Sequence, residues 1–277
     1  MSVSIKEVND YTSQFAEVIN NHKAKKYLGN IKVGVDLGTA NIVLSVVTED
    51  NQPLVGAIYP ASVVKDGIVV DFLQAVDIVK KLKQQVEKTL DKPLINAATA
   101  VPPRSIEGNI KVMTNVLESA FFNVSAVLEE TNAAANVLGI TDGAVVDVGG
   151  GTTGISILKN GEVIYTADEA TGGTHMSLVL AGARKISFEE AEMLKQDKSK
   201  ENEVFPVIKP VIEKMASIIK SHLQNFKDVE TIYVVGGAST FSGFEAVFQK
   251  HIGIETLKTE HPLLITPLGI AMQGGVN

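Results

Sequence analysis

Residues 143–158 read GAVVDVGGGTTGISIL, and this stretch decides the fold class. An apolar, β-branched run ends at Asp147, three consecutive glycines follow, and a second β-branched run begins after Gly154. Asn160-Gly161 is a two-residue hairpin signal, after which residues 162–166 can pair back. The pattern predicts a strand, a glycine turn, a second strand, a hairpin and a third strand.

The same order of elements occurs near the start of the chain. Residues 31–39 read IKVGVDLGT, an apolar strand that runs through Asp36 into a glycine turn. A second strand is expected at 41–47, and a polar turn separates it from a third at 53–59. Asp36 and Asp147 therefore take the same place in two similar units, 111 residues apart. We interpret this as an internal duplication that produces two domains.

Helical spacing of apolar residues alternates with these strands, and a further strand at 229–235 ends in Gly236-Gly237. Helices are expected at 4–23, 72–90, 109–120, 132–138, 174–181, 187–195, 206–226 and 267–272. Gly274-Gly275 predicts a frayed end. Strands mixed with helices in both halves predict an α/β fold with two domains around a cleft. The expected division is an N-terminal helix or extension at 1–30, a first domain at 31–140 plus 262–277, and a second domain at 141–261.

Composition narrows the class of protein. The chain has 277 residues, 45% apolar and 21% charged, which excludes disordered, collagen-like and low-complexity proteins. It has no Cys, so disulfide scaffolds, zinc ribbons, iron–sulfur centres and thiol nucleophiles are excluded. A net charge of −7 argues against nucleic-acid binding, because nothing general attracts a polyanion. Without a signal-type segment or a run of ~18 apolar residues, we expect a soluble, cytoplasmic protein that does not associate with a membrane.

The glycine stretch also matches a dinucleotide signature, which has to be weighed. Residues 149–154 fit G-x-G-x-x-G, and Asp168 and Glu169 stand near the expected acidic position. That site requires a helix directly after the glycines, so that the pyrophosphate lies at the helix N-terminus. Here β-branched residues and a hairpin follow, which disfavours a dinucleotide site, and no P-loop signature occurs.

The alternative is a pair of phosphate-binding turns. A turn without side chains lets backbone N–H groups reach a phosphate, and two such turns, one per domain, can grip a polyphosphate from both sides. The Asp at each strand end is suited to hold the waters of Mg²⁺, which prefers oxygen ligands and keeps several waters. For either turn alone, the competing interpretation is a tight hairpin capped by Asp36 or Asp147.

Five motifs resemble the actin, Hsp70 and sugar-kinase ATPase superfamily, and they occur in the superfamily's order. Residues 36–41 look like its first phosphate loop, and 147–153 like its second. Residues 234–239 are similar to the adenosine motif. Residues 129–135 and 267–271 resemble the two inter-domain connecting helices. The resemblance implies an actin-like ATPase fold, in which two duplicated ribonuclease-H-like domains enclose a nucleotide cleft.

Within the superfamily, residues 65–72, KDGIVVDF, look like the bacterial actin, pilus and division branch. The whole chain most resembles the ethanolamine-utilisation EutJ family, above all at 63–72, 115–120 and 165–173. This resemblance implies ATP and Mg²⁺ as cofactors, weak Mg²⁺-dependent ATPase activity, and a chaperone-like or assembly role. The implied partners are ethanolamine-utilisation enzymes or proteins of a bacterial microcompartment, with which the protein would associate. Self-association into a homo-oligomer is left open.

The resemblance also implies a set of site residues. Asp36 and Asp147 would order the waters of Mg²⁺, and Glu130 would orient the attacking water, because phosphoryl transfer asks mainly for positioning and charge neutralisation. The nucleotide-binding candidates are Gly38, Thr39, Ala40, Asn41, Gly149, Gly150, Gly151, Thr152, Thr153, Gly172, Gly173, Glu213, Gly236, Gly237, Ala238 and Ser239. Glu213 is included by analogy with residues that touch adenosine, against the simpler interpretation of an exposed carboxylate.

The chain departs from the superfamily pattern in two places. Thr131 stands where a proline usually follows the connecting-helix glutamate, and no Lys matches the catalytic lysine of Hsp70 proteins. His175 and the Arg184-Lys185 pair are weaker candidates, for which a structural histidine and a solvated surface pair are simpler interpretations.

Two other functions compete with ATP hydrolysis. The protein could be a nucleotide-gated interaction or structural module without significant hydrolysis, whose output is the state of a partner. A small-molecule kinase is a third option, but no feature of the sequence defines its second substrate.

Overall fold

The structure is a computed structural model, which describes residues 4–21 and 27–277. The last two residues of the helix expected at 4–23 lie outside the described residues.

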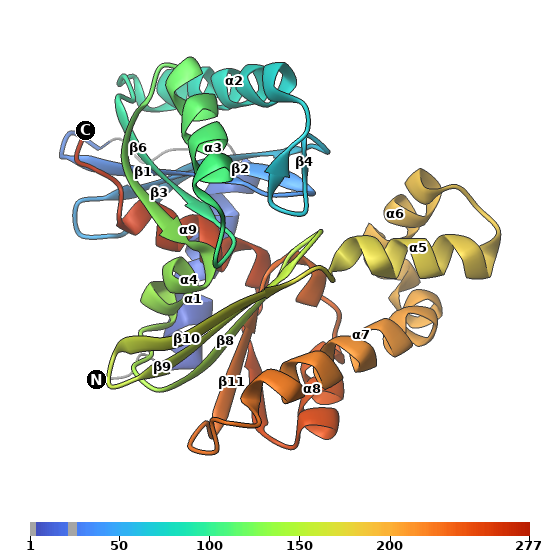
Figure 1. Cartoon of the computed structure of the whole chain (residues 1–277). Coiled ribbons are helices and arrows are strands. Elements are labelled where there is room, and N and C mark those ends of the chain that lie inside the picture. The colour runs from blue at the N-terminus through green and yellow to red at the C-terminus, as the bar shows by residue number, and fades with distance from the viewer. Residues whose placement is uncertain (1–3, 22–26) are drawn as a thin grey trace.

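Two five-stranded sheets with the same strand order form the frame of the molecule (Figure 1). The first sheet has the order β3-β2-β1-β6-β7, with bounds Pro53–Pro60, Asn41–Thr48, Ile31–Leu37, Asn96–Val101 and Asn123–Glu129. The second has the order β10-β9-β8-β11-β12, with bounds Glu162–Glu169, Thr153–Lys159, Gly143–Val148, Thr231–Val235 and Glu255–Lys258. In each sheet the first three strands are antiparallel and the other two are parallel. The predicted α/β duplication is therefore present strand by strand.

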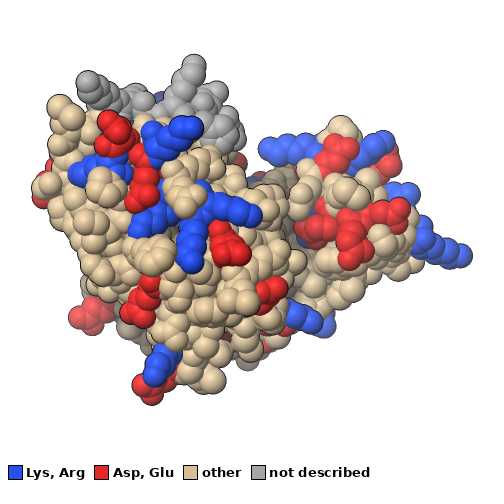
Figure 2. Space-filling model, turned by 90° about the horizontal axis from the view of Figure 1, so that it is seen from above, with Lys and Arg blue, Asp and Glu red and all other residues tan. Residues whose placement is uncertain are grey.

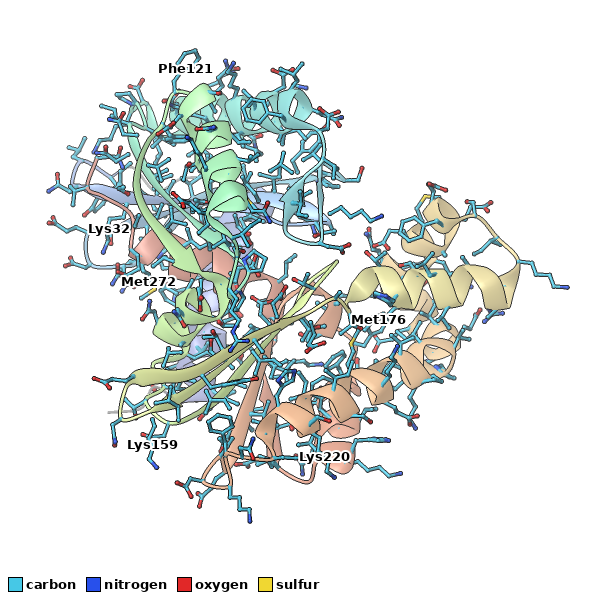
Figure 3. The ribbon with its side chains drawn as sticks, in the orientation of Figure 1. Lys32, Phe121, Lys159, Met176, Lys220 and Met272 are labelled. Carbon is cyan, nitrogen blue, oxygen red and sulfur yellow. The ribbon has the colours of Figure 1, made fainter. Side chains whose placement is uncertain are left out.

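Helices cover both sheets. Their bounds are α1 Ile5–Asn21, α2 Phe72–Leu90, α3 Glu107–Ser119, α4 Glu130–Leu138, α5 Gly173–Arg184, α6 Phe188–Gln196, α7 Glu201–Leu223, α8 Phe244–Ile252 and α9 Ile265–Met272. A two-stranded hairpin of β4 (Val64–Lys65) and β5 (Ile68–Val69) projects beside α2 (Figure 1). Short 3₁₀ turns occupy Lys198–Lys200, Gly237–Ser239 and Pro262–Leu264. Each sheet has its own buried apolar core, and Met176 of α5 points toward α7 in the second (Figure 3).

Several elements differ from the expectations. Strands β6 and β12 and helix α8 have no counterpart in the sequence prediction. Helix α7 begins at Glu201, before the expected start at Pro206, and carries Pro206 and Pro210 inside it. The helix follows directly on the 3₁₀ turn Lys198–Lys200, so its first turn precedes Pro206.

The prediction of a frayed C-terminus is wrong. Val276 bridges to Lys32 of β1, and the Asn277 side chain accepts hydrogen bonds from the N–H groups of Ile95 and Asn96 at 2.7 and 2.6 Å. At Gly274 a Cβ would lie 2.4 Å from the Val33 carbonyl oxygen, so this glycine allows close packing rather than mobility.

Helices α4 and α9 cross between the two sheets. A Cβ on Gly269 of α9 would lie 1.9 Å from the Ala133 carbonyl oxygen of α4, a distance that no side chain tolerates. On its other side α9 meets β1, where a Cβ on Gly34 would lie 2.4 Å from the Ala271 nitrogen. Glycine at both contacts lets α9 lie directly on the first sheet and on α4.

Helix α1 packs on the body and reaches both halves of the molecule. Val8 and Phe15 are fully buried, and the helix packs against β3, α4 and the Pro262–Leu264 turn. The Tyr11 hydroxyl donates to the Asn51 carbonyl at 2.6 Å, and the Glu260 N–H donates to Asn9 Oδ1 at 3.0 Å. The domain boundaries given above remain a prediction from the sequence. Helix α1 lies within the expected extension 1–30 and contacts both halves of the molecule.

Candidate functional site

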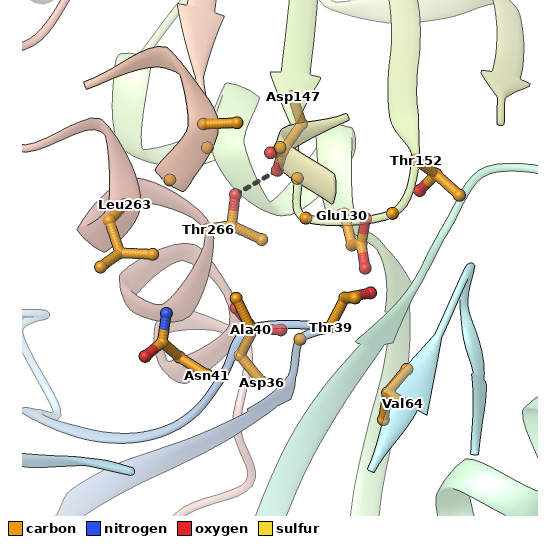
Figure 4. Close-up of a pocket in the computed structure, with 18 of the residues that line it drawn as sticks. Asp36, Thr39, Ala40, Asn41, Val64, Glu130, Asp147, Thr152, Leu263 and Thr266 are labelled. Carbon is orange, nitrogen blue, oxygen red and sulfur yellow. Dashed lines mark hydrogen bonds between the residues drawn. The ribbon is translucent and has the colours of Figure 1, made fainter. Parts of the chain in front are cut away.

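A cavity of about 330 Å³ is lined by residues from both halves (Figure 4). It lies where β1 and β8 end and their glycine turns begin. Fifteen of the predicted site residues line it: Asp36, Gly38, Thr39, Ala40, Asn41, Glu130, Asp147, Gly149, Gly150, Gly151, Thr152, Gly173, Gly236, Gly237 and Ala238. The structure thus brings together motifs that are up to two hundred residues apart in the sequence.

The second glycine turn is held by its own backbone and by α5. The Gly149 N–H donates to the Thr152 carbonyl at 3.0 Å, which closes the turn. The Gly149 and Gly150 carbonyls accept from the Gly173 and Thr174 N–H groups at 2.9 and 2.8 Å. The strand β9, not a helix, follows the glycines, so the geometry of a dinucleotide site is not formed.

Three carboxyl groups interact electrostatically in this cavity. Burial, then the charge of Asp147, raises the pKa of Asp36 to about 7. Burial raises the pKa of Asp147 to about 6, against a hydrogen bond from Thr266 that lowers it. Burial, then the charges of Asp147, Asp36 and Asp168, raises the pKa of Glu130 well above its ordinary value.

This carboxyl set fits a hydrated divalent cation. Like charges that raise one another's pKa values are relieved by a nearby cation, and carboxylate oxygens are the ligands that Mg²⁺ prefers. Within residues 4–21 and 27–277, no three His, Asp or Glu side chains are close enough to hold a metal ion directly. Asp36 and Asp147 would therefore hold Mg²⁺ through its waters rather than by a complete set of protein ligands.

Asp147 is held from two sides. The Thr266 hydroxyl of α9 donates to Asp147 Oδ2 at 2.6 Å, the contact drawn as a dashed line in Figure 4. On the other side, Gly236 has a φ of +89°, and a Cβ there would lie 2.3 Å from Asp147 Oδ1. Only glycine fits this position, both by its backbone and by the space available.

Sequence reasoning missed a group on α6. Glu192, Lys195 and Gln196 line the cavity. Lys195 Nζ donates to Glu192 Oε2 at 2.7 Å and to the Gly173 carbonyl at 2.9 Å. Burial lowers the pKa of Lys195, while Lys195 and two further hydrogen bonds hold the pKa of Glu192 below its ordinary value despite burial. The i, i+3 spacing of Glu192 and Lys195 was the available signal, but such pairs are common on solvated helices.

Four predicted residues do not line the cavity. Three of them contact segments that line the cavity. The Thr153 hydroxyl donates to the Thr171 carbonyl at 2.8 Å, and that of Ser239 to the Gly236 carbonyl at 2.8 Å. A Cβ on Gly172 would lie 2.7 Å from the Gly149 and Gly150 carbonyl oxygens. Glu213 is not among the residues that line the cavity, and its contact with adenosine stays a prediction. Glu213 lies on α7 away from the cavity, with Lys209 Nζ at 3.9 Å and His251 Nε2 at 4.0 Å. Among the described residues, none of α7 lines the cavity.

The weaker candidates lie at the surface. His175 is exposed on α5, and the Arg184 guanidinium donates to the Glu203 carbonyl at 3.2 Å. Acidic and basic side chains intermingle over the face seen from above (Figure 2). Across the described part of the chain, every helix is too short or too polar to cross a membrane.

Comparison with known proteins identifies the family to which this chain belongs. The "Ethanolamine utilization protein EutJ" of Escherichia coli (strain K12) is 43% identical over 243 residues, covering 87% of this chain and 85% of that protein. The chain belongs to the EutJ family. The crystal structure of EutJ from Carboxydothermus hydrogenoformans superimposes with a TM-score of 0.93 at 45% identity, covering 98% of this chain and 100% of that one.

Two wider matches concern a second family model and the fold. A family model described as "Type IV pilus assembly protein PilM" covers residues 109–263, more than half of this EutJ-family chain. MreB5 of Spiroplasma citri, solved bound to AMPPNP, shares the fold with a TM-score of 0.70 at 17% identity, covering 86% of this chain and 94% of that one. The predicted family and the actin-like fold class are confirmed.

Proposed function

We propose that this EutJ-family protein binds Mg²⁺·ATP in the cavity and hydrolyses the nucleotide slowly. The single observation that carries the proposal is the convergence of two glycine turns and three carboxyl groups, from both halves, on one cavity. The nucleotide bound by an actin-fold relative, AMPPNP in MreB5, supports ATP as the ligand.

Each part of the cavity has a role in this proposal. The backbone N–H groups of Gly38–Asn41 and Gly149–Thr152 would bind the phosphates, since both turns lack bulky side chains at their tips. Asp36 and Asp147 would hold the waters of Mg²⁺, whose charge, when bound, offsets that of the phosphates and carboxylates. Glu130 would orient the attacking water and accept its proton, which its raised pKa favours.

The nucleoside would lie at the α6 side of the cavity. A Cβ on Gly173 would lie 3.3 Å from both Ala238 Cβ and Lys195 Nζ, so the adenosine motif and Lys195 meet at this glycine. Glu192 and Lys195 offer an acceptor and a donor of opposite charge for ribose hydroxyls. Gly237 and Ala238 leave the backbone open for the flat face of a base.

The proposal extends to a cellular role. The name of the family, ethanolamine utilization protein, supports action within that pathway, as an assembly or chaperone-like factor for its enzymes or for a bacterial microcompartment. The partners would be proteins rather than nucleic acids or membranes, and the place the cytoplasm or the microcompartment surface. A homo-oligomer is compatible with this role.

The test uses the full chain with ATP. Ligand at 100 times its Kd stabilises the folded state by about 2.7 kcal/mol, so Mg²⁺·ATP should raise the melting temperature visibly. Asp147→Ala should remove the Mg²⁺-dependent part of this shift. Glu130→Gln should keep ATP binding and lose steady ADP release. The absence of any thermal shift with millimolar nucleotide would overturn the site assignment.

A second function, the nucleotide-gated module, is favoured by direct contacts between the two halves. The Thr131 and Ser156 hydroxyls lie 2.5 Å apart, and a Cβ on Gly151 would lie 2.9 Å from the Asp66 nitrogen, at the tip of the β4–β5 hairpin. A ligand that binds one arrangement of these contacts more tightly than another would change the molecule's shape by binding alone. ATP binding without ADP release in the unmodified protein would select this function over hydrolysis.

A further inference from the structure

Thr266 makes a contact that the superfamily resemblance does not account for. It lies in the first turn of α9, 5% exposed, and its hydroxyl donates to Asp147 Oδ2 at 2.6 Å. Asp147 is itself 6% exposed and belongs to β8 of the other sheet. The bond therefore joins a helix packed on the first sheet to the carboxylate that faces the cavity from the second (Figure 4).

The hydroxyl of Thr266 is specifically directed at this carboxylate. A threonine in a helix often donates to a carbonyl one turn earlier, which here would be that of Pro262. That carbonyl instead accepts from the Gly236 N–H at 3.0 Å. The same backbone segment thus positions both groups that flank Asp147, namely the Thr266 hydroxyl and the Gly236 backbone.

Thr266 is in turn fixed from the first sheet. The buried Ser45 hydroxyl of β2 donates to the Pro267 carbonyl at 2.6 Å, next to Thr266 in sequence. The close approach of Gly34 to Ala271 holds the other end of α9 on β1. The position of the hydroxyl therefore follows the position of the first sheet.

We propose that Thr266 is a positioning residue for Mg²⁺, whose hydroxyl orients the Asp147 carboxylate toward the hydrated ion that accompanies ATP. Asp147 has one oxygen bonded to Thr266 and the other against Gly236, so rotation of its carboxylate is restricted. Residues that orient the direct ligands of a metal typically affect its affinity by 10–100-fold, and because Asp147 would hold Mg²⁺ through water we expect the lower end of that range. The same bond makes Mg²⁺ affinity depend on how α9 sits against the first sheet. This inference rests on the proposed function.

The test is a Mg²⁺ titration of the whole chain at saturating ATP, in which the melting temperature is measured at each Mg²⁺ concentration. Thr266→Val keeps the shape of the side chain and removes the hydroxyl, and should raise the half-saturating Mg²⁺ concentration by about tenfold or more. Thr266→Ser keeps the hydroxyl and should stay within about threefold of the unmodified protein. ATP affinity in excess chelator, measured by calorimetry, should be equal in all three proteins, because the Mg²⁺ contribution is then absent.

The outcomes separate the inference from the function on which it rests. A Thr266→Val protein with unchanged Mg²⁺ half-saturation overturns the inference, as does a Thr266→Ser protein as impaired as the Val variant. An unmodified protein without any Mg²⁺ dependence overturns the proposed function itself. If Thr266→Val unfolds at assay temperature, Ser45→Ala, which frees the Pro267 carbonyl, should shift the half-saturation in the same direction, and no shift there overturns the inference.

Discussion

Gly150 of the second glycine turn lies directly against Thr39 of the first. A Cβ built on Gly150 would stand 3.0 Å from Thr39 Cβ and 3.5 Å from the Ala40 nitrogen. The two turns, which both line the cavity, therefore lie against each other although they belong to different sheets. A polyphosphate gripped by both turns has to part them at this contact.

Gly150→Ala should weaken ATP binding. The added methyl group occupies space between the turns and pushes Thr39 away, and we expect about a tenfold loss of affinity, or about 1.4 kcal/mol. Gly182→Ala is the matched control, because its Cβ would meet nothing within 4 Å. Calorimetric titration with ATP measures both, and equal affinity in the two variants would show that phosphates do not pass between the turns.

In the nucleotide-free protein, the contribution of Asp36 and Asp147 to stability should fall as the pH rises from about 4 to about 7. Asp36 and Asp147 have an ordinary pKa of 3.8, which the fold raises to about 7 and about 6. In this window the folded state binds more protons than the unfolded state, so the free energy of unfolding decreases with pH. The stabilising effect of these groups is complete below their unfolded pKa and lost as the pH passes their folded pKa values.

Asp36→Asn should remove much of that dependence. An amide has no charge to bury, and the variant should gain on the order of 1–3 kcal/mol in the free energy of unfolding at pH 8, with a smaller gain at pH 5. Urea unfolding at pH 5, 6.5 and 8 measures this. A gain that is constant across the three pH values would contradict the electrostatic origin.

Lys195→Met should distinguish the nucleoside from the phosphates. The thioether keeps the length of the side chain but loses the donor near Gly173, and ATP affinity should fall about tenfold. Tripolyphosphate has no nucleoside, and its affinity should not change. Lys200→Met is the control. In the described part of the chain, the Lys200 ammonium forms a surface ion pair with Glu203 and does not line the cavity. Equal losses for ATP and tripolyphosphate would place Lys195 at the phosphates instead.

Gly269→Ala should strongly destabilise the fold. Its Cβ would meet the Ala133 carbonyl oxygen at 1.9 Å, so α4 and α9 would have to move apart, at a cost of about 3 kcal/mol or more. Gly108→Ala in α3 meets nothing within 4 Å and should be neutral or slightly stabilising. Thermal unfolding of both variants is the measurement, and similar melting temperatures would refute the close crossing.

Local patterns carried most of the fold prediction. The antiparallel strands β1–β3 and β8–β10 pair with sequence neighbours through short turns, so apolar, β-branched runs, glycine turns and Asn160-Gly161 were enough to find them. Strands β6 and β12 pair in parallel with β1 and β11. Their pairing depends on distant residues, and β6 reads only NAATAV, whose small side chains give a weak strand pattern.

One feature of the site and one of the C-terminus were beyond local patterns for a related reason. Lys195 reaches the cavity only because α6 folds back beside Gly173, a contact across 22 residues of sequence. Gly274 looks like a flexible end in sequence, but it is required by the backbone of β1 beside it. A glycine that permits close packing and a glycine that permits motion have the same letter, and only the neighbouring chain distinguishes them.

The position of α1 has a consequence for the synthesis of this protein. Its apolar face packs against β3, α4 and the turn at Pro262–Leu264, so its binding surface is complete only when nearly the whole chain has been made. At about 5–20 residues per second, ribosomal synthesis of the intervening segment takes on the order of 10–50 seconds. During that time Val8 and Phe15 lack part of the core that buries them in the folded protein. Helix α1 is therefore synthesised well before the Pro262–Leu264 part of the surface on which it packs.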